Sequence, residues 1–192
     1  MAGHRSFAGW YISQEIDDVH WRTPEADRIL VRYLRDLTRD LRVSGAHPVA
    51  VSAFSNAAMN PRELATFWAG VLTETEIDLL LFQDGIGTEK LDLVQLPQYL
   101  QALNGAVRHA GRSLRVIVEA FRQTSGPAIN DLEFRAEPAP FERIRTQLAL
   151  AAQHSTAPAV LFSAPDYMRP SAGPEGAELF DRYTAWRQSA CR

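Results

Sequence analysis

The chain has 192 residues, of which 46% are hydrophobic and 22% are charged. This balance predicts a folded protein with one substantial core and a single domain over residues 1–192, and it excludes a disordered or fibrous chain. The net charge is −3 with both signs interspersed, and no run of Lys and Arg with interleaved aromatic residues indicates a nucleic-acid surface. We therefore expect no nucleic-acid partner.

The sequence carries no export or membrane signal. Its first ten residues, MAGHRSFAGW, lack a charged segment followed by an apolar one, and no apolar run reaches the ~20 residues of a membrane span. We expect no signal peptide in this chain, no membrane span, and a cytoplasmic location by default; a full-length parent would be exported if it carried a signal. The single cysteine excludes an intramolecular disulfide.

Short apolar runs alternate with segments of helical periodicity along the chain. In chain order, the expected strands are 9–13, 48–54, 77–83, 114–121 and 158–164. The expected helices are 24–43, 61–74, 95–110, 138–153 and 175–188. The first two helices have start signals in Thr23 with Pro24 and in Asn60 with Pro61. The alternation predicts an α/β fold of about five parallel strands, with helices covering one face of the sheet and a packed interior filling the other.

Polar residues end or follow every expected strand. In parallel α/β folds the ligand site forms at the carboxyl ends of the strands, so this edge is where chemistry is expected. The residues placed there are Gln14, Glu15, Asn56, Gln83, Asp84, Glu119 and Tyr167. The glycines Gly85 and Gly87 allow the backbone to turn sharply close to a ligand.

These residues also have structural interpretations. Asp84 before Gly85 is a common turn pair. Glu119 lies inside an apolar run, where an unpaired charge is costly, so it either forms a structural ion pair or faces a wet cleft. Trp10 and Tyr167 belong to a group of aromatic residues near the strands, and such rings either pack in the core or stack on the apolar faces of sugars.

Other kinds of site lack their sequence patterns. The five histidines are scattered without the spacing of a metal site, so we expect neither a metal nor a cofactor. The G-x-S-x-G pattern of a serine nucleophile is absent as well.

Several segments together resemble an uncharacterised bacterial family. They are Gly9-Trp10-Tyr11-Ile12 with Glu15-Ile16-Asp17, Val51-Ser52-Ala53-Phe54, Phe82-Gln83-Asp84-Gly85-Ile86-Gly87, and Val118-Glu119-Ala120-Phe121. The chain resembles domain of unknown function 4434, a group of TIM-barrel, glycoside-hydrolase-like domains, over most of its length, and Q-D-G-x-G after a strand is the most specific element. The resemblance implies a relative of the (β/α)8 barrel with a carbohydrate partner.

The resemblance also exposes a departure, because members of that family begin with further strands and helices before the G-W-Y segment. Counting back from the end, 9–13 corresponds to the fourth barrel strand and 158–164 to the eighth. We therefore expect an incomplete TIM-barrel-type repeat that is weak or inactive as an enzyme on its own. Its first and last strands are expected to be apolar sheet edges that promote self-association.

Under that count, the resemblance implies a retaining glycosidase in which Glu119 is the nucleophile and Glu15 the acid/base. In retaining glycosidases built on this barrel the acid/base Glu is usually preceded by Asn, where this chain has Gln14. The substrate-binding groups implied are Gln14, Gln83, Asp84, Tyr167, Trp10 and Asn56, with Asp84 either holding sugar hydroxyls or orienting the nucleophile. One alternative is a non-catalytic carbohydrate-binding or structural remnant of such a glycosidase. A second is a doubly wound domain that holds a phosphorylated ligand at the turn 85–87, although it lacks the phosphate-binding glycine signatures.

Overall fold

The computed structural model describes residues 4–190, and of Ala190 the backbone alone. Residues 1–3 and 191–192 lie outside the described part. The first of these ranges begins the segment that was expected to carry no signal peptide, and the second includes the single cysteine. Within the described part the chain has an α/β fold with a five-stranded parallel sheet and helices between the strands, which confirms the predicted fold class.

The main sheet has the strand order β1-β2-β3-β4-β7. Its strands are β1 (Trp10–Ile16), β2 (Val49–Ala53), β3 (Leu79–Gln83), β4 (Ser113–Glu119) and β7 (Val160–Phe162). A second, two-stranded antiparallel sheet is formed by β5 (Phe121–Gln123) and β6 (Ala136–Pro138). In the main sheet β1 and β7 are the edges, as expected, and the predicted self-association through them stays a prediction.

The helices are α1 (Pro24–Val43), α2 (Pro61–Glu74), α3 (Leu96–His109), α4 (Phe141–His154), α5 (Ala164–Tyr167) and α6 (Gly173–Ala190), with a 3₁₀ turn η1 (Pro170–Ala172). The two predicted helix starts are confirmed. Thr23 caps α1 by accepting a hydrogen bond from the N–H of Ala26, and Asn60 forms a reciprocal capping box with Glu63 at the start of α2.

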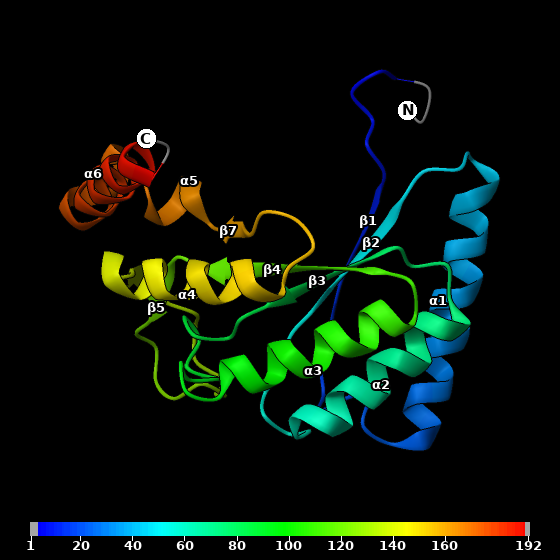
Figure 1. The fold of residues 1–192 in the computed structure, drawn as a ribbon. Helices are drawn as coiled ribbons and strands as arrows, with labels where there is room; N and C mark the ends of the chain where they lie inside the picture. The colour runs from blue at the N-terminus through cyan, green and yellow to red at the C-terminus, as the bar shows by residue number, and fades with distance from the viewer. Residues whose placement is uncertain (1–3, 191–192) are drawn as a thin grey trace.

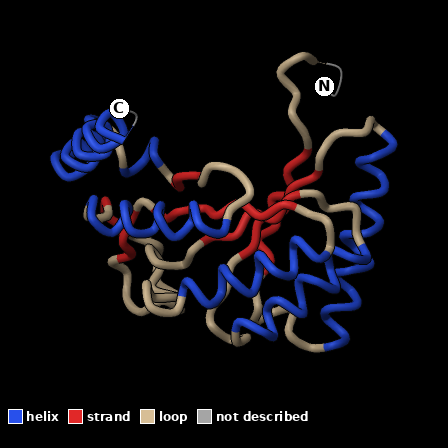
Figure 2. The backbone as a smooth tube through the Cα atoms, viewed as in Figure 1, coloured by secondary structure: helices blue, strands red, loops and turns tan. Residues whose placement is uncertain are grey.

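One face of the main sheet packs against the helices. Figure 1 shows α1, α2 and α3 gathered on the same side of the strands, and Figure 2 shows the strands between these helices and the more open opposite side. The alternation along β3 follows from this arrangement, because Leu80 and Phe82 point to the helices and are fully buried. The core also includes Trp68 of α2, which is 0% exposed.

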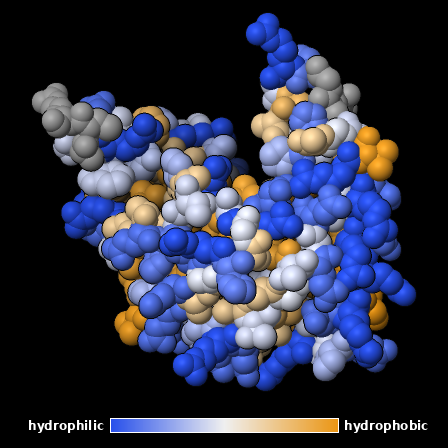
Figure 3. Space-filling view, turned by 45° about the vertical axis from the view of Figure 1, so that its right-hand side comes forward, coloured by the Kyte–Doolittle hydropathy of each residue, from blue (hydrophilic) through white to orange (hydrophobic). Residues whose placement is uncertain are grey.

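The other face of the sheet is only partly covered, whereas the sequence predicted a packed interior there. Leu79, Leu81 and Gln83 alternate with the buried residues of β3 and are half-buried. Tyr11 of β1 and Phe162 of β7, at the two edges, are exposed. Figure 3 shows a hollow on this side, between the segment before β1 and the part of the molecule that carries α6. The face is open because β1 and β7 do not pair to close the sheet.

Several predicted boundaries were wrong for identifiable reasons. The first strand extends to Ile16 instead of ending at residue 13, because a bulge lengthens it. The expected strand 114–121 breaks after Glu119, and Phe121 starts β5 in the small sheet. Helix α4 begins at Phe141 instead of residue 138, because Pro138 pairs in β6 and Pro140 takes the N-cap position. The expected strand 158–164 is shorter, since α5 begins at Ala164.

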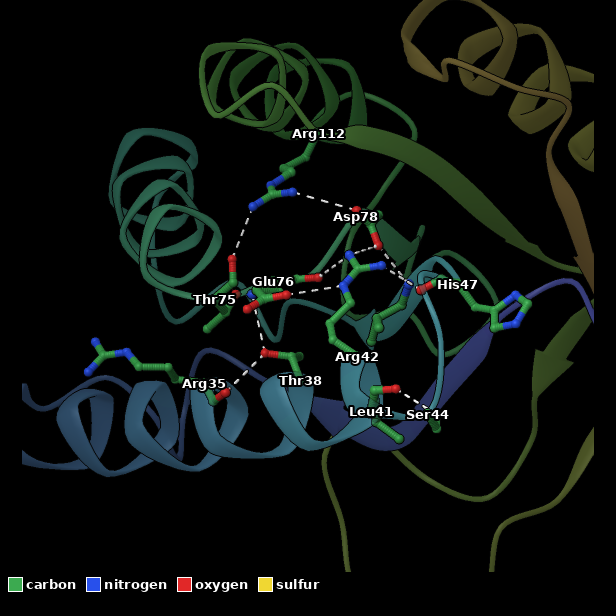
Figure 4. Close-up of polar contacts among 11 residues, drawn as sticks. Arg35, Thr38, Leu41, Arg42, Ser44, His47, Thr75, Glu76, Asp78 and Arg112 are labelled. Atoms are coloured by element: carbon green, nitrogen blue, oxygen red, sulfur yellow. Dashed lines mark hydrogen bonds and ion pairs between the residues drawn. The ribbon is translucent and has the colours of Figure 1, made fainter. Parts of the chain in front are cut away.

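A network of charges joins the elements at the amino end of the sheet (Figure 4). Asp78, directly before β3, accepts hydrogen bonds from Nη2 of Arg42 at 2.6 Å and from the N–H of Val49 at 2.7 Å. Nη1 of Arg112 lies 3.6 Å from the same carboxylate. Arg42 also donates to the carbonyl of His47 at 2.5 Å. One carboxylate thus links the end of α1 to the starts of β2, β3 and β4.

We expect Asp78→Ala to lower the free energy of unfolding by about 2–3 kcal/mol, because it leaves the N–H of Val49 without its acceptor and removes the carboxylate that Arg42 and Arg112 share. Urea denaturation measures this loss. Asp36→Ala is the matched control, since Asp36 and Arg39 form an exposed pair at 3.5 Å that should contribute less than about 1 kcal/mol. Equal losses in the two variants would show that the network does not stabilise the fold.

Candidate functional site

The carboxyl ends of β1, β2 and β3 are joined by one amide. Gln83, the last residue of β3, donates from Nε2 to Oε1 of Glu15 on β1 at 2.9 Å and to Oγ of Ser52 on β2 at 3.2 Å. These side chains lie on the face of the sheet that the helices leave open. The structure therefore brings together Glu15 and Gln83, two of the residues that the sequence predicted for the site.

A bulge in β1 determines where Glu15 lies. Ile12 pairs with Val51, but the next paired residue is Glu15, opposite Ser52, so β1 carries two additional residues at this point. One of them is Gln14, whose side chain is exposed. Without the bulge, Ser13 would lie opposite Ser52, and Glu15 would be displaced beyond the reach of Gln83.

The loops after β1 and β2 are tied together by a buried carboxylate. Asp18 is 0% exposed and accepts hydrogen bonds from Oγ of Ser55 at 2.6 Å and from the N–H groups of Asn56 at 2.7 Å and Met59 at 3.0 Å. The N–H of Ala58 is a fourth donor to the same carboxylate. Through these four hydrogen bonds Asp18 holds the loop that carries Asn56. Its role is structural.

The fourth strand ends in a buried carboxylate. Glu119 is 2% exposed, and its Oε2 accepts hydrogen bonds from the N–H of Thr88 at 2.8 Å and from Oγ1 of Thr88 at 3.3 Å. Burial raises the pKa of Glu119, although hydrogen bonds from Thr88 and Gly87 and the charge of Lys90 act in the opposite direction. Glu119 has no ion pair within 4 Å in the described part of the chain.

Gly87 is the residue that allows Glu119 to be enclosed in this way. A Cβ atom at position 87 would lie 2.5 Å from the carbonyl oxygen of Phe121 and 2.9 Å from Oε2 of Glu119. The last glycine of the Q-D-G-x-G segment is therefore required by the close approach of backbone and carboxylate.

Asp84 lies behind Glu119 and is fully buried. Its Oδ1 accepts from the N–H groups of Ile86 and Glu119, both at 3.3 Å, and Nε2 of Gln147 on α4 donates to Oδ2 at 2.5 Å. Burial, followed by the charge of Glu119, raises the pKa of Asp84 to about 7. Its contact with Glu119 is to the backbone N–H, and the two roles expected for Asp84, holding sugar hydroxyls or orienting the nucleophile, stay predictions.

Two adjoining clefts open at this edge of the sheet, with volumes of about 300 and 200 Å³. Lys90, Ala128 and Asn130 line both clefts. The larger one is also lined by Asp17, Val19, His20, Phe54, Asn56 and Ile129. The smaller one is also lined by Thr88, Gln123, Ser125, Leu132 and Phe134. Together they have the size of a small-ligand site with aromatic and polar walls.

Lys90 lines both clefts and was not among the residues that the sequence predicted for the site. Its ammonium lies 3.9 Å from the centre of the Phe54 ring. Burial lowers the pKa of Lys90, while the charges of Glu119, Glu15, Asp17 and Asp18 raise it. The segment after Asp84 indicated this position, because it forms a turn that folds back on itself. The N–H of Lys90 bonds to the carbonyl of Gly85 at 2.9 Å, and this contact brings the end of the turn back to the sheet edge.

His20 forms the rim of the larger cleft together with Asp17. Its Nδ1 lies 2.7 Å from Oδ2 of Asp17, and Oδ1 of Asp17 accepts from the N–H groups of Val19 and His20 at 2.7 and 2.8 Å. Burial raises the pKa of Asp17, but these hydrogen bonds outweigh it and leave the pKa below its ordinary value. Asp17 is thus an ionised, positioned acceptor beside the cleft.

The two aromatic residues predicted for the site lie apart from the clefts. The ring of Tyr167, in α5, packs against Phe121 with ring centres 5.3 Å apart, next to the end of β4. Trp10 opens β1 at the amino edge of the sheet, and its ring packs against Phe7 with ring centres 5.0 Å apart. Since β1 runs from Trp10 to the carboxyl edge, the strand itself separates Trp10 from Glu15. The structure does not bring Trp10 together with the other predicted residues.

The described residues form neither a metal site nor a membrane-spanning helix. Across residues 4–190, no three His, Cys, Asp or Glu side chains come together in a way that would hold a metal ion. None of the helices in this range combines the length and the apolar character needed to cross a lipid bilayer.

Comparisons with known proteins identify relatives at the level of sequence. The model of a family described as "Domain of unknown function (DUF4434)" matches residues 1–174. "Uncharacterized protein YbcH" of Escherichia coli (strain K12) is 34% identical over 141 residues, which is 73% of this chain and 45% of YbcH. The chain thus spans less than half the length of this relative.

A solved structure shares the fold. The crystal structure of a protein described as "a putative alpha-L-fucosidase", from Bacteroides thetaiotaomicron VPI-5482, superposes with a TM-score of 0.74 at 20% sequence identity. The match covers 96% of this chain and 55% of that one. At this identity the likeness shows the fold alone, which resembles a glycosidase barrel.

Proposed function

The chain belongs to the family described as domain of unknown function DUF4434, and we propose that it is a glycoside-hydrolase-like protein that acts on an oligo- or polysaccharide by a retaining mechanism. What supports this proposal is that Glu15, bonded to Gln83, and Glu119, bonded to Thr88, both lie at the carboxyl ends of strands of one sheet, with the half-buried Lys90 near enough for its charge to act on both. The fold match to a protein described as a fucosidase is consistent with a carbohydrate substrate.

The proposal assigns one of the two roles to each glutamate. In the proposed mechanism Glu15 protonates the glycosidic oxygen as Glu119 attacks the anomeric carbon and forms a covalent glycosyl ester. Glu15 then removes a proton from the water that breaks this ester, and the configuration is retained. Gln83 orients Glu15, and Thr88 orients Glu119 through two hydrogen bonds.

In the proposed mechanism, the turn that covers Glu119 has to move. With 2% of Glu119 exposed, a sugar reaches the carboxylate only if the turn carrying Thr88 moves aside. Thr88 lines the smaller cleft, so a ligand in that cleft would contact the residue that has to move.

The burial of Glu119 favours a second candidate function, a carbohydrate-binding protein without catalysis. In this case the Glu119 carboxylate is a structural acceptor for Thr88. Phe54, His20, Asn56 and Asn130 would provide the aromatic and polar contacts for a sugar in the clefts.

The experiment that separates the two functions is a hydrolysis assay with aryl glycosides and polysaccharides, in which NMR follows the anomeric configuration of the first product. Glu15→Gln should lower turnover by about 10²–10⁴-fold for substrates with poor leaving groups, because it removes the general acid. Substrates with good leaving groups, such as dinitrophenyl glycosides, need little protonation and should be affected much less.

Glu178→Gln is the matched control for this substitution, because Glu178 on α6 has a side chain that is 70% exposed. An equal loss for good and poor leaving groups would remove Glu15 from the acid role. Glycan binding without any hydrolysis by the wild type would select the binding protein.

A further inference from the structure

Two carboxyl groups lie close together in the interior without a cation bonded to either. Asp84 is 0% exposed and Glu119 is 2% exposed, and the N–H of Glu119 donates to Asp84. Within residues 4–190 no Lys, Arg or His nitrogen lies within 4 Å of either carboxylate. Two negative charges buried in this way repel each other and lose their hydration, so the pair is expected to retain a proton.

The nearest guanidinium does not neutralise the pair directly. Arg143, from α4, donates from Nη2 to the backbone carbonyls of Glu119 at 3.0 Å and of Phe121, and from Nη1 to the carbonyl of Ile86 at 3.4 Å. Its Nη1 and Nη2 groups thus donate to the backbone, its buried Nε–H has no partner in the described part of the chain, and it acts on the two carboxyls only through space.

The surroundings of the two carboxyls differ in a way that decides where the proton resides. Glu119 receives two hydrogen bonds from Thr88, and the positive charge of Lys90 acts to lower the pKa of Glu119. Asp84 receives two long backbone bonds of 3.3 Å and one from the neutral amide of Gln147. The ionised form is better stabilised on Glu119, and the protonated form is better tolerated on Asp84.

The partner of Asp84 also has an unused acceptor. Oε1 of Gln147 is buried and has no hydrogen-bond donor in the part of the chain that the structure describes. Since Gln147 is the side chain bonded to the Asp84 carboxyl, this oxygen is available to a proton on Oδ2 of Asp84 if the amide rotates.

We propose that Asp84 and Glu119 together carry a single negative charge at neutral pH, with the proton on Asp84. Asp84 is then a positioning residue that leaves Glu119 as the ionised group of the site. The importance of this charge assignment for catalysis rests on the proposed function, in which Glu119 is the nucleophile and has to be ionised. The groups that act on Asp84 are Glu119 from β4 and Gln147 and Arg143 from α4.

The experiment measures the free energy of unfolding of the wild type and of Asp84→Asn between pH 4 and 8. The pKa of Asp84 is raised in the folded state from its ordinary value of 3.8 to about 7. Between these values the folded state holds a proton that the unfolded state has lost, so stability falls as the pH rises through this window. The ratio of the folding equilibrium constants, wild type over Asp84→Asn, should fall by up to about tenfold per pH unit.

Asp40→Asn, at an exposed position on α1, controls for the substitution itself. A ratio for Asp84→Asn that stays constant or rises with pH would overturn the proposal. If Asp84→Asn does not fold, the titration of the wild type labelled with ¹³C at the aspartate carboxyls replaces it, with Gln147→Met identifying the Asp84 signal. A midpoint at or above pH 7 supports the proposal, and one below pH 7 overturns it, because Asp84 would then be mostly ionised at neutral pH. Neither measurement needs a substrate, so failure of the proposed hydrolase function leaves the charge assignment standing.

Discussion

Glu119→Gln is expected to reduce the hydrolysis of a glycan by about 10³-fold or more while leaving the binding of the same glycan within about threefold. The amide keeps the shape of the side chain and its hydrogen bonds from Thr88, but it cannot form the glycosyl ester. The chemical step needs the ionised carboxylate, whereas ground-state binding depends on the cleft walls. Steady-state kinetics measures the first effect, and calorimetric titration of the variant measures the second.

The same substitution at Glu178 on α6 should leave both quantities unchanged. Turnover of Glu119→Gln within tenfold of the wild type would exclude Glu119 as the nucleophile. Loss of binding together with turnover would instead indicate that Glu119 supports the shape of the cleft, as the binding-protein function requires.

Gly87→Ala is expected to lower the free energy of unfolding by about 2–4 kcal/mol. The added Cβ would lie 2.5 Å from the carbonyl oxygen of Phe121 and 2.8 Å from Cβ of Glu119. Neither atom belongs to the free end of a flexible side chain, so the turn and the end of β4 would have to separate. Urea denaturation measures the loss.

Gly105→Ala is the matched control, because a Cβ at this helical position of α3 meets nothing within 4 Å. It should stabilise the protein by about 0.5–1 kcal/mol through helix propensity. If Gly87→Ala were as stable as Gly105→Ala, the enclosure of Glu119 by the turn would be looser than the structure shows.

The features of the fold that the sequence predicted correctly are those with local causes. The caps at Thr23 and Asn60 act on helices that start one residue later, and the apolar runs of β2 and β3 are buried by the helices beside them. The bulge that places Glu15 was not predictable, because it depends on pairing with Ser52 of another strand. The short pairing of β5 with β6 across the segment 124–135 was not predicted either.

The candidate site was predictable to a similar extent. A charged residue inside the apolar run of β4 indicated Glu119, and the order of the strands placed it at the same edge as Glu15. Burial of Asp84 was not foreseen, because Gln147 comes from α4 and meets it only in the folded chain. Trp10 was assigned to the site from its aromatic character, but the direction of β1 places it at the opposite edge.

The two walls of the clefts differ in stiffness, with a consequence for how a ligand enters. On one side the loop of Asn56 is held by the four donors that converge on Asp18. On the other, the segment 124–135 is held mainly by hydrogen bonds within itself, and Ile129 and Leu132 are each 65% exposed. For a ligand in these clefts we therefore expect the wall formed after β1 and β2 to select by shape and the opposite wall to govern the rates of entry and release.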